Sequence, residues 1–184
     1  MKLLLASASP RRRELLIKLG VSFEIVPSAF EETAEGLSAY DTAKRFAEGK
    51  AKEVYGRYAD CFVLGADTVV SLDGRIFGKP ESEADAARML RRLSGKTHSV
   101  YTGVCLIGKD FFASGVAETK VSFYPLEERT ISQYVASGLP MDKAGAYGIQ
   151  DDFPLVKGYE GSYTNVVGLP TERVRALFKE AGIC

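Results

Sequence analysis

Apolar and polar positions recur along the chain with two different periods, which predict both strands and helices. An unbroken apolar run at 61–66 is typical of a strand buried on both faces of a sheet. Between 38 and 58, apolar residues recur every three or four positions and predict an amphipathic helix that packs on that sheet. The same helical period predicts further helices at 82–93, 126–137 and 171–181.

Period-two patterns predict strands at the start and in the middle of the chain. We expect strands at 21–26 and 164–167, and an antiparallel meander of three strands at 97–107, 111–117 and 118–124. The Asp73-Gly74 pair indicates a hairpin turn. Because strands and helices alternate early and a meander follows, we predict a single α/β domain over 1–184. Its mixed, twisted sheet is flanked by helices, with a cleft between two lobes.

The first segment combines a short strand, a loop of small residues and a helix that begins near Ser9. The Ser9 hydroxyl can accept from free backbone N–H groups of the first helical turn. Three arginines crowd this helix N-terminus, where the helix dipole favours anions: Arg11, Arg12 and Arg13. Strand, loop and helix N-terminus form a common phosphate-binding geometry, and arginine adds bidentate contacts. We interpret the cluster as a phosphate site; the alternative is a solvated basic face.

Acidic candidates lie after the buried run and in an early loop. Asp67 follows the apolar residues directly, at the predicted carboxyl end of a buried strand, where α/β proteins build their sites. It could act as a general base on water or as a magnesium ligand. The alternative is a structural aspartate that accepts from backbone amides. Glu31 and Glu32 could share a metal with it, or belong to a solvated loop.

Two lysines and one glycine-rich segment complete the candidates. Lys79 lies on a stiff turn between Gly78 and Pro80, and Lys52 lies in a helix whose alanine-rich face is predicted to pack on the sheet. Either lysine could hold a phosphate, although most lysines face solvent. The segment 142–151 could fold over a ligand, or be only a long connection.

Composition narrows the class of partner. Lysine plus arginine and aspartate plus glutamate each number 24 in the 184 residues, which argues against bulk binding of nucleic acid or membranes but allows a local basic pocket. No apolar stretch approaches the length of a membrane span. The cysteines are widely spaced and no signal peptide precedes them, so we expect a reducing cytoplasm: Cys61, Cys105 and Cys184.

Six motifs in order, spanning Lys2 to about Ala181, resemble those of the Maf family, also called septum formation inhibitor. They are SASPRR at 7–12, GADT at 65–68, GKP at 78–80, YTGV at 101–104, DKAGAYGIQ at 142–150 and NVVGLP at 165–170. Members of the family are nucleoside triphosphate pyrophosphatases. The resemblance implies hydrolysis between the α and β phosphates, a divalent metal (Mg²⁺ or Mn²⁺) and a cytoplasmic homodimer. It also implies an elongated two-lobed fold similar to that of inosine triphosphate pyrophosphatases.

The resemblance also implies roles for individual residues. Asp67 matches the proton acceptor, and with Glu32 it would hold the metal. The specificity positions match Arg11, Thr68 and Gln150. The charged and polar pocket matches Ser7, Arg12, Glu32, Lys52 and Lys79. The stretch 146–150 resembles the branch of the family that acts on dTTP and UTP.

Three other functions remain open at this point. A non-catalytic nucleotide-binding regulator of septum formation would bind nucleotide tightly without releasing pyrophosphate. A phosphatase would release orthophosphate instead. A nucleic-acid binder that uses the arginine cluster would show steeply salt-dependent affinity, and the zero net charge makes it the weakest of the three.

Overall fold

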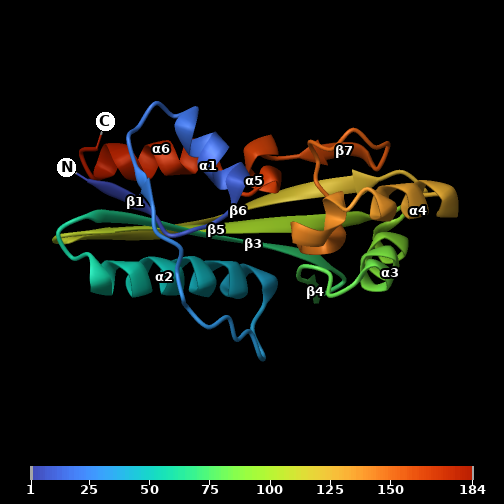
Figure 1. Ribbon diagram of the computed structural model, residues 1–184, viewed down its shortest axis with the longest axis horizontal. Helices are drawn as coiled ribbons and strands as arrows, with labels where there is room; N and C mark the ends of the chain where they lie inside the picture. The colour runs from blue at the N-terminus through green and yellow to red at the C-terminus, as the bar shows by residue number, and fades with distance from the viewer. Residues whose placement is uncertain (1, 184) are drawn as a thin grey trace.

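The computed structural model describes residues 2–183, which form a seven-stranded mixed sheet with helices on both faces (Figure 1). The strands are β1 (Leu3–Leu5), β2 (Glu24–Ile25), β3 (Phe62–Leu72), β4 (Arg75–Phe77), β5 (Thr97–Gly108), β6 (Phe111–Phe123) and β7 (Val156–Glu160). The helices are α1 (Pro10–Ile17), α2 (Ala39–Arg57), α3 (Glu83–Leu93), α4 (Glu128–Ala136), α5 (Tyr163–Val167) and α6 (Thr171–Glu180). Two short 3₁₀ helices follow α4: η1 (Leu139–Asp142) and η2 (Ala144–Ala146).

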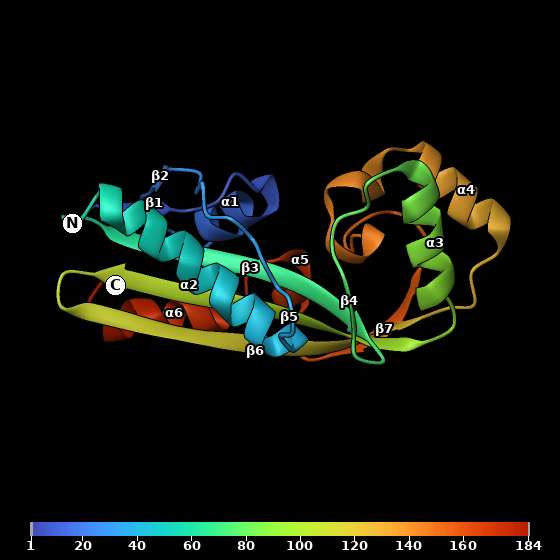
Figure 2. The same cartoon turned by 90° about the horizontal axis from the view of Figure 1, so that it is seen from below.

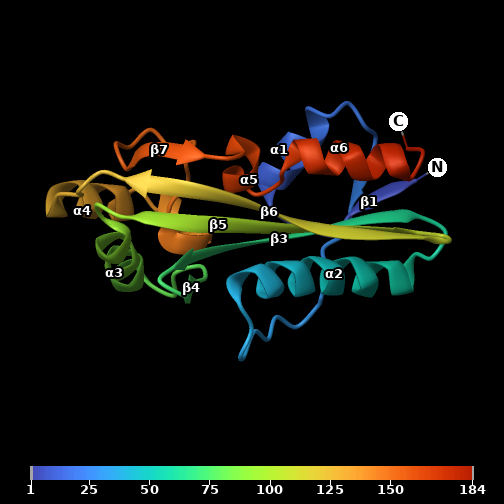
Figure 3. The ribbon, with the colours of Figure 1, turned by 180° about the vertical axis from the view of Figure 1, so that it is seen from behind.

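The sheet has the strand order β2-β1-β3-β5-β6-β7, with β4 paired to β3. Strand β1 is parallel to β2 and β3, whereas the other pairs are antiparallel. The long strands β3, β5 and β6 run along the longest axis of the molecule, with α2 on one face and α6 on the other (Figure 3). The predicted mixed sheet flanked by helices is therefore confirmed.

Helix α2 lies unusually close to the sheet because two glycines face it. A Cβ at Gly65 on β3 would lie 2.3 Å from the Ala47 carbonyl oxygen, and one at Gly103 on β5 would lie 2.1 Å from that of Ala43. No side chain fits in that space, so glycine permits the helix backbone to rest on the strands. Ala43, Ala47 and Ala51 are fully buried in this contact. The close contact fixes where the flanks of α2 lie relative to β3.

The helices divide into two lobes along the sheet (Figure 2). In one lobe, α1 and α6 pack on one sheet face and α2 on the other, because side chains of β1 alternate between the two sides: Leu3 and Leu5 belong to the first cluster and Leu4 to the second. In the other lobe, α3, α4 and the segment 139–155 pack around Val70 and Val121 at the far end of the sheet. The two-lobed prediction is thus confirmed.

Several predicted elements differ from the structure. Residues 111–123 form one strand, not two, because β6 pairs with β5 without interruption from Phe111 to Ser122. Residues 164–167 belong to helix α5, because the Ser162 hydroxyl caps its first turn and the buried Asn165 amide donates to the Val100 carbonyl 3.1 Å away. Strand β2 is shorter than predicted, and β7 was not predicted. Cys184 lies outside the described residues.

Among residues 2–183, no helix combines the length and the apolar character needed to cross a bilayer.

The single histidine is buried in the core of the second lobe. His98 on β5 is 2% exposed, and its Nε2 lies 2.7 Å from the Tyr147 hydroxyl. Its ring stands edge-on to Phe123, with centroids 5.1 Å apart. Burial lowers the pKa of His98 from 6.5 to about 4. His98 is therefore neutral in the folded protein near pH 7.

This lowered pKa predicts a loss of stability in acid. As pH falls below 6.5 the unfolded chain takes up the His98 proton, whereas the folded chain does so only near pH 4. The free energy of unfolding should therefore fall by up to about 3 kcal/mol from this group over that interval. Denaturant unfolding at pH 7 and pH 4.5 measures the change. His98→Gln, which cannot titrate, should show a shallower pH dependence, and an equal dependence in both proteins would contradict the assignment.

Candidate active site

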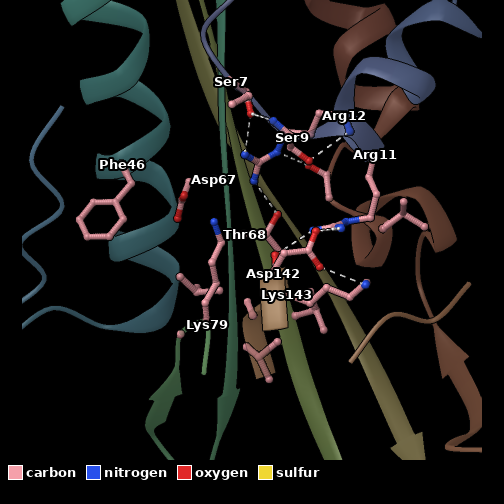
Figure 4. A pocket seen from close by; sticks show the side chains of 18 of the residues that line it. Ser7, Ser9, Arg11, Arg12, Phe46, Asp67, Thr68, Lys79, Asp142 and Lys143 are labelled. Carbon is pink, nitrogen blue, oxygen red and sulfur yellow. Dashed lines mark hydrogen bonds and ion pairs between the residues drawn. The ribbon is translucent and has the colours of Figure 1, made fainter. Parts of the chain in front are cut away.

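A cavity of about 630 Å³ lies between the two lobes (Figure 4). This volume is within the usual range of small-molecule sites. Most of the sequence-predicted site residues line it: Ser7, Arg11, Arg12, Glu32, Asp67, Thr68, Lys79 and Gln150. Figure 4 shows the Lys79 side chain rising from the turn after β4 toward Asp67 and Thr68.

The sequence had suggested that Asp67 lies at the carboxyl end of a strand, but it lies in the middle of β3. The short strand β1 stops at Leu5, opposite Leu64, so β3 continues past the end of its parallel neighbour. After Ala6 donates its N–H to the Leu64 carbonyl, the chain turns away into α1 and leaves space beside β3. Asp67, 7% exposed, lies beside this opening. The site is thus at the carboxyl end of β1, although β3 itself runs on.

Asp67 shares one cation with a second carboxylate. The Lys50 ammonium lies 2.6 Å from Asp67 Oδ1 and 2.6 Å from Glu32 Oε1. Burial raises the pKa of the Asp67 carboxyl, while the charges of Lys50 and Arg12 oppose that rise. A buried carboxylate with a raised pKa beside cations suits a general base that works near neutral pH. Glu31, by contrast, does not line the cavity.

The structure does not bring Lys52 to the cavity. Its side chain is 60% exposed, lies 3.6 Å from Glu48 and stands over the Phe112 ring of β6. Two residues along a helix correspond to about 200° of rotation, so Lys50 and Lys52 lie on opposite flanks of α2. Because Ala47 and Ala51 fix the packed face, the Lys50 flank faces the cavity and the Lys52 flank faces β6. Lys50, which sequence reasoning missed, takes the place expected of Lys52.

Arg12 is held by three acceptors on three segments. Its Nε donates to the Gly168 carbonyl at 2.9 Å, and its terminal nitrogens donate to Ser7 Oγ at 3.2 Å and Thr68 Oγ1 at 3.1 Å. Burial lowers the pKa of Arg12, and the charge of Asp67 opposes this shift. A guanidinium has five N–H groups, so this arrangement leaves two for a ligand. Arg12 is therefore a fixed cation inside the cavity.

The other two arginines of the cluster differ from each other. Arg11 donates to the Asp142 carboxylate at 2.6 Å and to the Asp142 carbonyl at 3.0 Å, and this pair joins α1 to η1 across the cleft. Arg13 is exposed and lines a separate shallow depression with Ile17. The expectation that the whole cluster faces one anion is therefore wrong for Arg13. Asp142 was also missed as a partner, because no local pattern reveals a contact over 131 positions.

The segment that carries Gln150 is fixed from behind by a buried network. The Tyr134 hydroxyl accepts from the Gly148 N–H at 2.9 Å and donates to Asp151 Oδ2 at 2.6 Å. The Lys143 side chain, 8% exposed, lies 3.5 Å from the same Asp151 oxygen. Gln150 itself is exposed at the cavity wall. The segment predicted to fold over a ligand is thus an ordered wall of the cavity.

The acidic residues fit a metal that is shared with a substrate. Two carboxylate oxygens, from Glu32 and Asp67, already converge on one cation, the Lys50 ammonium. Within residues 2–183 there is no group of three His, Cys, Asp or Glu side chains that could enclose a metal alone. Mg²⁺ is commonly held by one or two carboxylates together with waters and substrate phosphates. The donor set therefore fits an ion of that kind.

A buried carboxylate facing fixed cations in a cleft is typical of enzymes that act on phosphorylated small molecules. The family model described as "Maf-like protein" matches residues 2–181, so the chain belongs to the Maf family.

Curated relatives match along the whole chain. A protein of Koribacter versatilis (strain Ellin345) is 47% identical over 185 residues, covering 100% of this chain and 96% of its own. One of Moorella thermoacetica is 50% identical over 186 residues, covering 99% and 96%. Each of these relatives is named "dTTP/UTP pyrophosphatase". A solved structure, "The structure of the Staphylococcus aureus Ham1 protein", has 15% identity and a TM-score of 0.46, covering 67% of this chain and 71% of that chain.

Proposed function

We propose that the protein is a nucleoside triphosphate pyrophosphatase. It hydrolyses dTTP and UTP between the α and β phosphates, and it releases the nucleoside monophosphate and pyrophosphate. The observation that carries the proposal is the single cavity in which Asp67 faces Lys50 and Arg12. Relatives named for this activity, at 47% and 50% identity over the full chain, support the choice of substrate.

In the proposed reaction, Asp67 takes a proton from a water molecule as that water attacks the α phosphorus. The bond between the α phosphorus and the bridging oxygen breaks, and the electron pair leaves with pyrophosphate. Arg12, Lys50 and Lys79 stabilise the charge that develops on the phosphates, because they are positively charged and converge on one cavity. Ser7 helps to fix Arg12 through their hydrogen bond of 3.2 Å. Because these hydrogen bonds hold Arg12 in place before substrate arrives, its guanidinium needs no reorganisation during the reaction.

We further propose that Glu32 and Asp67 hold a divalent metal, Mg²⁺ or Mn²⁺, when the triphosphate is present. Such an ion neutralises phosphate charge and polarises the phosphorus centre that is attacked. In the structure, Lys50 lies between the two carboxylates. Its ammonium is then expected to turn toward the phosphates, where a lysine acts as a mobile point charge.

One panel of assays tests the function. UTP, dTTP, CTP and dATP are each incubated with Mg²⁺, Mn²⁺ or EDTA, and pyrophosphate and orthophosphate are measured separately. We expect pyrophosphate and monophosphate in equal amounts from UTP and dTTP, and none in EDTA. Release of orthophosphate with a diphosphate would identify a phosphatase. Tight nucleotide binding without any product would identify a non-catalytic regulator.

Gln150 is expected to contribute to the choice of base. Its amide lies at the exposed end of the cavity wall and can both donate and accept a hydrogen bond, as a pyrimidine edge requires. Gln150→Ala should lower the preference for UTP over ATP, measured as the ratio of kcat/KM values, by about tenfold, which corresponds to one lost polar contact. Gln133→Ala, which changes an exposed glutamine on α4, serves as the control. An unchanged preference in Gln150→Ala would contradict this role.

We also propose that the protein works in the cytoplasm as a homodimer, as the family resemblance implies. Light scattering or sedimentation of the purified protein at micromolar concentration measures the assembly. A monomer that retains full activity on UTP would contradict the dimer.

A further inference from the structure

A chain of hydrogen bonds leads from the cavity into the core beneath it. Arg12 donates to Thr68 Oγ1 at 3.1 Å, and Thr68 Oγ1 lies 2.9 Å from Thr102 Oγ1. Thr102 Oγ1 in turn lies 2.9 Å from the carbonyl oxygen of Asn165, which lies in the middle of α5. Thr68 and Thr102 are direct neighbours across β3 and β5, and Thr102 is fully buried.

The direction of each of these hydrogen bonds follows from the groups at the two ends of the series, the Asn165 carbonyl and the Arg12 guanidinium. The Asn165 carbonyl has no proton, so the Thr102 hydroxyl donates its single proton there. The contact between Thr102 and Thr68 then requires the proton of Thr68. At the other end a guanidinium can only donate, so Arg12 uses a lone pair of Thr68. The hydroxyl of Thr68 is thereby oriented from both sides.

The consequence for the cavity is chemical. Thr68 lines the cavity, yet its proton points away toward Thr102, so it offers a ligand one remaining lone pair and no donor. Phosphate oxygens are acceptors, and two acceptors in contact repel each other in a site of low dielectric. Thr68 therefore suits an N–H or O–H group of the ligand and does not suit its phosphates. In dTTP and UTP the shared donors are the base N3–H and the sugar 3′-hydroxyl.

We propose that Thr102 is a positioning residue for substrate specificity: it keeps Thr68 an acceptor, which selects nucleotides that present a donor from the nucleoside. The inference rests on the proposed function for the identity of the ligand. Cytosine has no proton on N3, and a 3′-deoxynucleotide lacks the hydroxyl, so these two analogues separate the two sources of the donor. A site that holds a buried acceptor for a ligand donor discriminates strongly against analogues without that donor.

Thr102→Val tests the proposal, because valine keeps the shape of the side chain and removes the acceptor for the Thr68 proton. Two ratios of kcat/KM are measured, UTP over CTP and dTTP over 3′-deoxy-dTTP. In Thr102→Val the Thr68 hydroxyl can rotate and donate, so at least one ratio should fall about fivefold or more. Thr102→Ser, which keeps the hydroxyl, should retain both ratios within about twofold. Thermal melting of both variants confirms that they fold.

Three results would overturn the proposal. Both ratios could stay unchanged in Thr102→Val, or activity could fall equally on every nucleotide, as expected of a purely structural role. Thr102→Ser could also lose the preference to the same extent as Thr102→Val. If Thr102→Val does not fold, Thr68→Val removes the acceptor itself, and retention of both ratios in that variant would be the overturning result.

A failure of the proposed function would be visible separately. If the wild-type protein releases no pyrophosphate, the activity is refuted. The same ratios are then measured as Kd values for α,β-methylene analogues of UTP and CTP, and of dTTP with and without its 3′-hydroxyl. These values test the roles of Thr68 and Thr102 without requiring turnover.

Discussion

Asp67→Asn is expected to lower kcat for UTP hydrolysis by about 10³-fold, because asparagine cannot accept a proton from water and general bases contribute on this scale. Asparagine has the same shape and can still accept from Lys50, which lies 2.6 Å from the Asp67 carboxylate. Folding and the binding of a non-hydrolysable UTP analogue should therefore change little. Single-turnover kinetics measure the chemical step, and calorimetry measures the binding.

A matched control for this variant is Asp110→Asn. Asp110 lies in the turn between β5 and β6. Its backbone φ is 58°, a left-handed conformation that asparagine also adopts readily. The same change of charge there should leave kcat within about twofold, since surface substitutions away from special features have small effects. A near-native rate in Asp67→Asn would remove the proton-acceptor role from this residue.

Lys50→Ala is expected to lower kcat/KM by about 10²-fold, while Lys52→Ala should stay within about twofold, because of these two lysines it is Lys50 that lines the cavity. Both residues are lysines on α2, so the two variants change the net charge equally. They differ only in which flank of the helix loses the charge. The Lys50 charge also opposes the rise that burial causes in the pKa of Asp67. Removing this charge should therefore raise the pKa of Asp67 further and move the acid limb of the pH profile of kcat/KM to higher pH.

The outcome that contradicts this assignment is a reversed order, with Lys52→Ala more damaging than Lys50→Ala. Such a result would mean that α2 turns when substrate binds, since Lys52 is 60% exposed over β6. Activity of both variants at one fixed pH, together with the full pH profile of Lys50→Ala, decides between the two lysines.

The sequence predicted the sheet and its helices because their hydrophobic periods are strong. Helix α2 matches its pattern from the Ser38 cap onward, and the Asp73-Gly74 hairpin joins β3 to β4 as expected. The same patterns failed where a tertiary contact decides the local structure. Residues 164–167 are apolar enough for a strand, but the Asn165 side-chain N–H groups donate to the Val100 carbonyl of β5 and to the Thr119 hydroxyl of β6, and these contacts hold the segment as a helix.

The candidate site was predictable where residues follow each other along the chain and not where they meet through the fold. Ser7, Arg12 and Asp67 stand in compact motifs, and the structure brings them to one cavity. The choice between Lys50 and Lys52 depends on which flank of α2 faces β1, which periodicity alone does not determine. The contact of Asp142 with Arg11 depends on how the two lobes are arranged, and no local pattern encodes that arrangement.

The ion pair that links α1 to η1 has a consequence for any anion that approaches the site. Arg11 already has an anionic partner, the Asp142 carboxylate, at 2.6 Å. A phosphate that binds Arg11 must displace that carboxylate, so the net free energy of this contact is the difference between two similar ion pairs. The displaced carboxylate would then repel the bound phosphate across the cleft, which favours anions that bind together with a cation.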